Sequence, residues 1–160
     1  MTRKPLIAAG TLMGIGMGGF VDGILFHQIL QIHSMLSAKY PQNTVENIEI
    51  SMVWDGLFHA FTWITVAVSV GMLWNVGRQK DIPWSGVTFF GAQLMGWGIF
   101  NLVEGIIDHH LLGIHHVVER LGLSMYDYLF LLSGVVLISA GLLLIKKDTK
   151  KFYEKTSTIQ

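Results

Sequence analysis

Long apolar stretches separated by short polar segments dominate this chain. Four of them are long enough to cross a bilayer as an α-helix, which takes about 20 residues. Backbone groups in lipid must be paired within their own segment, so the pattern predicts an all-α integral membrane protein, a four-helix bundle. The expected helices run over residues 6–36, 53–76, 84–112 and 126–145, in a transmembrane domain over residues 1–146 with a basic tail over residues 147–160.

The polar positions that interrupt the first and third stretches follow the same pattern. FVDGILFHQILQIHSM at 20–35 and LVEGIIDHHLLGIHHV at 102–117 share an acid-Gly-x3-His-x5-His motif at an offset of 82 residues. The second and fourth stretches correspond more weakly, with VWDGLF at 53–58 and MYDYLF at 125–130, at an offset of 72 residues. The sequence therefore predicts two tandem helical-hairpin repeats, related by an axis along the membrane normal.

Composition agrees with a membrane protein and excludes several classes of function. Hydrophobic residues make up 51% of the chain and charged residues 14%, and the mean hydropathy is +0.50. The net charge of zero provides no field that would attract nucleic acid. Because the chain has no cysteine, disulfides, thiolate metal sites and thiol catalysis are excluded.

The distribution of lysine and arginine predicts the orientation in the membrane. The N-terminus, the linker after the second stretch and the tail hold nine of them, whereas the other two linkers hold only Lys39 and Arg120. Since basic residues accumulate on the cytoplasmic side, we expect both termini to be cytoplasmic in a multi-pass protein of the inner (plasma) membrane.

Acidic residues and histidines within the apolar stretches are the candidates for chemistry. Each intramembrane charge costs roughly 2.5 to 3.5 kcal/mol on insertion scales, so a group of them calls for a compensating ligand. Imidazole and carboxylate are ligands for iron, zinc, manganese or copper, and the topology places these side chains in the outer half of the membrane. The expected metal ligands are His27, Asp55, His59, Glu104 and His109. The residues expected to orient these ligands or replace them are Asp22, Asp108 and Asp127, and His33 and His115 are expected to form an outer layer.

Helical geometry constrains how each repeated segment can contribute. Asp22 and His27 are five residues apart, which places them about 140° apart on an ideal α-helix. Gly23 and Gly105, beside the two acids, allow a π-bulge or a kink that would change this angle. From Asp22 to His33 a continuous helix would span ~16.5 Å, too far to serve one ion. We therefore expect a ladder of polar layers.

Several functions are compatible with such a site. The preferred one is a redox or oxygen-linked role, as in a membrane metal-dependent oxidoreductase, and the alternatives are a metal-ion or proton transporter and a b-type haem protein. Haem would be held between His27 and His109, although the nearby acids disfavour it. Taken singly, His33, His110 and His116 are equally explained as interhelical hydrogen-bonding groups. The expected partner is the lipid bilayer, with a homo-oligomer or a membrane enzyme partner left open.

The segments GFVDGILFHQILQIH, WDGLFHA and NLVEGIIDHHLLGIHHV resemble a family of bacterial predicted membrane proteins that is classed as a domain of unknown function. The resemblance extends from about Gly10 to Ile145. It implies a bacterial multi-pass membrane protein and implies no activity, so the functional interpretation depends on the residues.

Overall fold

Four long helices make up most of the chain that the computed structural model describes, which covers residues 2–157. They are α1 (Lys4–Val21), α2 (Val45–Arg78), α3 (Gly86–Glu104) and α4 (Met125–Ser157). Two π-helical segments continue α1 and α3, namely η1 (Asp22–Ile29) and η2 (Gly105–Leu111), and a short 3-10 turn, η3 (Glu119–Leu121), follows. The all-α prediction is confirmed, and residues 2–157 contain no strand.

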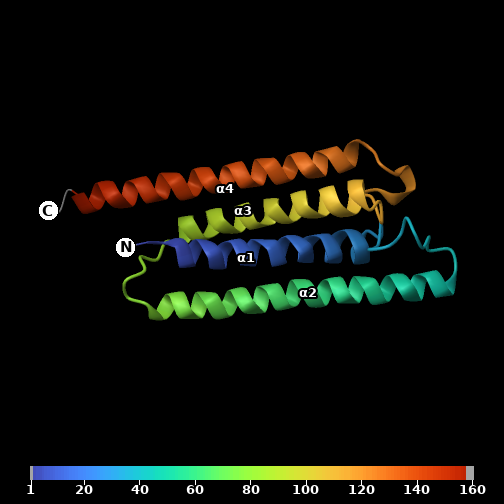
Figure 1. Cartoon of the computed structure of the whole chain (residues 1–160), viewed down its shortest axis with the longest axis horizontal. Helices are drawn as coiled ribbons and strands as arrows, with labels where there is room; N and C mark the ends of the chain where they lie inside the picture. Colours follow the sequence, from blue (N-terminus) through green and yellow to red (C-terminus); the bar gives the residue numbers. More distant parts are fainter. Residues whose placement is uncertain (1, 158–160) are drawn as a thin grey trace.

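The helices stand side by side in a row in the order α2, α1, α3, α4 (Figure 1). Each packs on its neighbour in the row, but within the described chain no Cα atom of α2 comes within 8 Å of α3 or α4. The arrangement is therefore a flat bundle with α1 and α3 at its centre. We call the end where α1 and α3 finish and α2 and α4 begin the site end (Figure 1).

The outer surface of the bundle is apolar. Each of the four helices has the length and composition to cross a membrane. Large side chains such as Trp63, Trp74 and Leu111 are 64%, 70% and 73% exposed. An apolar surface of this extent is unfavourable in water and is covered by lipid in a membrane protein.

Glycines allow α1 and α3 to approach closely at the centre of the row. A Cβ atom added to Gly14 would meet the backbone carbonyl of Gln93, and one added to Gly96 would meet the carbonyl of Thr11. Small residues at such positions are the usual means by which membrane helices pack backbone to backbone. This contact holds together the two helices that carry the repeated motif.

Both π-helical segments end in the same way. At the end of each, a backbone N–H donates to the carbonyl five residues earlier, at 2.8 Å. The chain then turns sharply at Gln31 (φ 51°) and Gly113 (φ 53°), which adopt the left-handed conformation. The expected continuation of the first helix to residue 36 is therefore wrong, since the chain leaves the helix after Ile29.

The other helix limits also differ from those expected. Thr44 caps α2 by accepting a hydrogen bond from the N–H of Asn47 at 3.2 Å, so α2 begins at Val45 instead of residue 53. At the opposite end of the molecule from the site, α4 continues well beyond residue 145. There the Asp148 carboxylate accepts hydrogen bonds from Arg3 (2.6 Å), Ser85 (2.6 Å) and Thr88 (2.7 Å). This Asp148 clasp ties α4 to the starts of α1 and α3.

Candidate metal centre

The π-helical segments bring the acid and the first histidine of each motif onto one face. A π-helix bonds residue i to residue i+5, so groups five residues apart point the same way. Nε2 of His27 consequently lies 3.0 Å from Oδ2 of Asp22. In the second half, Glu104 and His109 have the same spacing and belong to one group of potential metal ligands. The wider helical turn, which Gly23 and Gly105 were expected to allow, therefore forms in both halves.

The second histidine of each motif returns to the same place. Because the chain reverses after each π-helical segment, Nε2 of His33 lies 3.7 Å from Oδ1 of Asp22. In the other half, Nε2 of His115 lies 3.5 Å from Oε1 of Glu104. The predicted ladder of polar layers is thus replaced by one compact cluster, because the prediction assumed an unbroken helix.

The two halves fix each other's histidines through backbone carbonyls. Nδ1 of His33 donates to the carbonyl of Val117 at 3.0 Å, and Nδ1 of His115 donates to the carbonyl of Met35 at 3.1 Å. The two histidines are 82 residues apart, and so are the two residues whose carbonyls accept these bonds. This is the offset between the repeated motifs in the sequence. A donor role for Nδ1 leaves Nε2 as the nitrogen with a free lone pair.

Asp55, in the third turn of α2, and Asp127, in the first turn of α4, lie beside the other two histidines. Nδ1 of His27 lies 3.0 Å from Asp55, and Nδ1 of His109 lies 3.1 Å from Asp127. These carboxylates also cap the returning loops, since Asp55 accepts from the N–H of Met35 and Asp127 accepts from that of Val117. A carboxylate behind a histidine sets its tautomer and raises its basicity as a ligand.

Aromatic rings complete the support of the same two histidines. The ring of Phe58 stacks on His27 at a centroid distance of 5.6 Å, and that of Phe130 stacks on His109 at 5.3 Å. The packing limits the rotation of both imidazoles. His27 is therefore held by a hydrogen bond to Asp55 and by one ring, and His109 by its close contact with Asp127 and by one ring.

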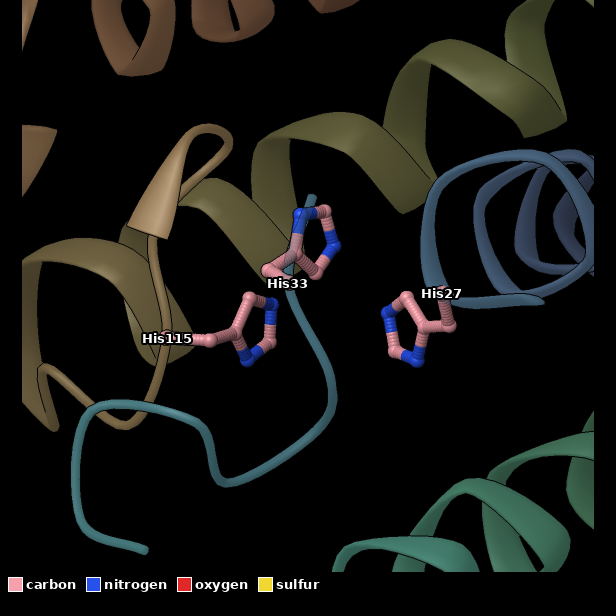
Figure 2. A group of neighbouring side chains, drawn as sticks. All are labelled: His27, His33 and His115. Atoms are coloured by element: carbon pink, nitrogen blue, oxygen red, sulfur yellow. The ribbon is translucent and has the colours of Figure 1, made fainter. Parts of the chain in front are cut away.

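Six side chains converge at the site end. Ligand atoms lie within 4.8 Å of one another in each of three overlapping groups. These groups are His27 with His33 and His115, Glu104 with His109 and His115, and Asp22 with His27 and Glu104. Figure 2 shows the first group, with His27 extending from the end of the first helix and His33 and His115 from the two loops. All six residues are buried.

Many polar atoms of this cluster have no partner among the described residues. They include Nε2 of His27, His33 and His115 and both carboxylate oxygens of Glu104. Oδ2 of Asp22 lies close to His27, yet neither atom completes a hydrogen bond of good geometry. A buried polar atom without a partner costs about 1–3 kcal/mol, so the cluster is unfavourable unless something binds to it.

Electrostatics favours neutral imidazole at the loop side of the cluster. Burial, reinforced by the neighbouring His33 and His109, holds the pKa of His115 well below its usual range. His115 is fully buried. At neutral pH its ring is consequently uncharged, which is the form that binds a metal ion.

Other residues expected at the site lie around the cluster. His59 contacts its own helix, with Nδ1 2.7 Å from the carbonyl of Asp55, and none of the three groups includes it. Asp55 and Asp127 contact His27 and His109 from behind, and Asp108 is half-buried beside the cluster. The structure thus brings together six of the ten expected residues.

Two contributions to the site were missed from the sequence. The carbonyls of Met35 and Val117 hold the loop histidines, and the rings of Phe58 and Phe130 stack on the helix histidines. The carbonyl positions follow the second histidine of each motif by two residues, so the repeat itself contained the signal. Main-chain groups cannot otherwise be recognised from residue types.

An open cavity between the connecting loops borders the cluster at His33. Its volume is about 810 Å³, and it is lined by residues of both connecting loops, including His33. Its wall is mainly apolar, and Gln31, Glu119 and Arg120 are among its polar residues. The cavity therefore extends to His33, while the Nε2 atoms of His33 and His115 stay buried behind its wall.

Comparison with known proteins agrees with the fold. The comparisons with curated proteins and with solved structures gave no match. Residues 9–148 match the family model described as "Predicted membrane protein (DUF2243)". That range contains all six residues of the cluster and most of the four candidate membrane-spanning helices, from Ala9 to Asp148. The chain therefore belongs to this family of predicted membrane proteins, DUF2243.

Proposed function

We propose that this membrane protein binds transition-metal ions in the six-residue cluster and uses them in a redox or oxygen-linked reaction. The observation that carries the proposal is the convergence of buried, unpartnered Nε2 and carboxylate oxygen atoms. An unliganded set of this kind is costly, and a bound cation removes the cost by giving every free lone pair a partner.

The spacing of the donor atoms supports a metal ion. Two ligands each about 2.1 Å from one ion lie roughly 3.0 to 3.4 Å apart. The contacts of Asp22 with His27 (3.0 Å) and of Glu104 with His115 (3.5 Å) are close to this range. Asp22 and Glu104 also belong to one group whose ligand atoms lie within 4.8 Å of one another. A cation between the two carboxylates would relieve their repulsion.

The donor set favours particular metals. Two histidines and one carboxylate occur together as His109, His115 and Glu104. This combination is the ligand type of non-haem iron sites, which leave positions open for oxygen or substrate. When bound, such an ion would supply one-electron and oxygen chemistry, while the surrounding Asp127 and backbone carbonyls hold the imidazoles in place.

Metal analysis of the purified protein tests the proposal. We expect at least one iron, copper, manganese or zinc ion per wild-type chain by elemental mass spectrometry. His115→Ala and His109→Ala should lose most of this metal, because each removes a donor from the cluster. His59→Ala is the matched control and should keep it, since His59 belongs to no potential ligand group.

Two results would contradict parts of the proposal separately. Wild-type protein that retains helical structure and holds no stoichiometric metal would overturn the metal centre. Zinc alone would leave metal binding standing and would overturn the redox role, because zinc has no redox chemistry in proteins. A change in the visible or paramagnetic resonance spectrum on adding dithionite is the expected sign of a redox metal.

A proton relay is the second candidate, and one contact favours it. The ring of His27 lies between Asp22 and Asp55, 3.0 Å from each. Chains of acid and histidine of this kind move protons in membrane proteins. Metal-free protein that carries protons across liposomes, and loses this activity in His27→Ala, would favour the relay over the metal centre.

Haem is less well supported by the geometry. A macrocycle would need open space around its iron, whereas Asp22 and Glu104 stand within 4.8 Å of His27. Absence of a Soret band in the purified protein is therefore expected.

The proposed orientation, with both termini in the cytoplasm, would put the cluster toward the outside of the cell. The basic residues near both termini support cytoplasmic ends, which would leave the loop cavity on the outer face. Since the chain has no natural cysteine, Asn43→Cys tests this directly. We expect an impermeant thiol reagent to label it in intact cells, and labelling only after permeabilisation would reverse the orientation.

A further inference from the structure

An apolar groove on the lipid-facing side reaches the cluster from a second direction. It has a volume of about 480 Å³ and lies between α2 and α3, with Ile15 of α1 among its lining residues. Its apolar lining includes Trp54, Phe58 and Phe61 of α2, and Glu104 and Asp108 also border it. Trp54, Phe61 and Val103 in its wall are exposed on the apolar outer surface, so the groove opens toward the lipid.

We infer that this groove binds a membrane-soluble aromatic molecule that carries a hydroxyl group, such as an alkylated phenol or hydroquinone. The inference deepens the proposed function by naming a substrate class for the same site, and its catalytic meaning rests on that function. Binding itself is measured separately from metal content.

The polar end of the groove offers a carboxylate that accepts hydrogen bonds. Glu104 is 5% exposed, and its two oxygens have no partner among the described residues. Asp108, one turn further along, is half-buried and makes no side-chain hydrogen bond that the described chain supplies. The Glu104 oxygens are buried and belong to the cluster, so Asp108 is the acceptor that a ligand hydroxyl, which is a donor, meets in the groove.

The walls of the groove favour an aromatic body. Trp54 and Phe61 are 46% and 56% exposed within a volume suited to a small ligand. Aromatic rings pack on one another in offset or edge arrangements that add to the burial of apolar surface. A neutral head also reaches this depth more cheaply than an ammonium group, because a charge in the hydrocarbon is costly.

The other half of the molecule lacks the features that make the groove. At the positions related by the 82-residue offset, Phe26 stands in place of Asp108 and Trp97 in place of Ile15. Larger rings there replace a carboxylate and a smaller side chain. The groove therefore breaks the internal repeat. It lies beside Asp108, whose related position in the other half is occupied by Phe26.

Quenching of Trp54 tests the inference in protein reconstituted in nanodiscs. The probe is a long-chain alkyl bromophenol, whose bromine quenches tryptophan on contact, and the matched compound is the alkyl bromobenzene without a hydroxyl. The quenching component is assigned to Trp54 by its loss in Trp54→Phe. We expect the phenol to quench at about tenfold lower concentration, as a hydrogen bond to a carboxylate of ~1.5 kcal/mol provides.

Two variants separate the groove from the metal centre. Val103→Phe narrows the groove, and should abolish quenching by both probes while metal content stays at the wild-type level. Asp108→Leu should remove the preference for the phenol. Circular dichroism checks that both variants keep their helices.

Equal quenching by the two probes would overturn the inference and identify the groove as a seat for lipid chains. Stronger quenching by the corresponding trimethylammonium compound would overturn it in favour of a cation site. Metal-free wild-type protein that still prefers the phenol would support the inference while refuting the metal centre. The reverse result, metal retained with no phenol preference, would refute the inference alone.

Discussion

At the scale of single residues, the site depends on the oxygen atom that the Nδ1 atom of each imidazole faces. Four histidines have their Nδ1 atoms directed at an oxygen, either a carboxylate or a backbone carbonyl. This arrangement leaves the opposite nitrogen of each buried ring for a ligand. The supporting oxygens therefore determine metal affinity as much as the histidines do.

The aspartate behind His109 provides the first prediction. Asp127→Asn should lower metal affinity by about 10–100-fold, because the amide no longer attracts the Nδ1 proton as a carboxylate does. Competition with a chelator, followed by elemental analysis, measures the change. Asp81→Asn, at an exposed loop position, should leave affinity unchanged. Full retention by Asp127→Asn would show that the 3.1 Å contact has no role in binding.

Residue types in the sequence predicted which groups could take part, but not which of them meet. All six residues of the cluster were among the ten candidates. His33 and His115 were expected in an outer layer because the chain reversals at Gln31 and Gly113 could not be foreseen. His59 was expected among the ligands because it shares a helix face with Asp55, yet its ring bonds to the preceding turn.

At the scale of elements, the helix ends decide the geometry at both ends of the molecule. Near the site, π-helical turns convert a five-residue spacing into a shared face. At the other end, the Asp148 clasp joins α4 to the starts of α1 and α3, a contact that the apolar pattern of the sequence does not predict. Hydropathy locates spans well but does not show where such polar contacts extend a helix, which is why α4 is longer than expected.

The clasp provides a prediction about stability. Asp148→Ala should lower the free energy of unfolding by about 1.5–3 kcal/mol, because it leaves the Arg3 guanidinium without its carboxylate. Thermal denaturation in detergent measures the loss, and metal content should be unchanged because the clasp lies away from the cluster. Lys150→Ala removes only an exposed pair with Glu154 and should shift stability by less than about 0.5 kcal/mol.

At the scale of the whole molecule, the helices of the two halves pack together through the contact of α1 with α3. Helices α2 and α4 each pack on one central helix and not on each other (Figure 1). The alignment of the two halves, and with it the cluster, thus depends on backbone contact between two glycine-rich helices.

Widening this contact should affect stability and metal binding together. Gly14→Ala forces its methyl group against the carbonyl of Gln93, which should cost about 1–3 kcal/mol and reduce bound metal. A Cβ atom added to Gly71 would meet no atom within 4 Å, so Gly71→Ala should be neutral or slightly stabilising. Equal behaviour of the two variants, measured by thermal denaturation and elemental analysis, would show that the close approach of α1 and α3 is not needed.

The exchanged bonds between the loops have a consequence for how such a molecule could have arisen. His33 depends on a carbonyl of the second half, and His115 on a carbonyl of the first. Neither hairpin alone can keep its own loop histidine in position. A single hairpin could build such a site only as a symmetric pair, and fusion of two copies would free each half to differ from the other, as Asp108 and the groove beside it do.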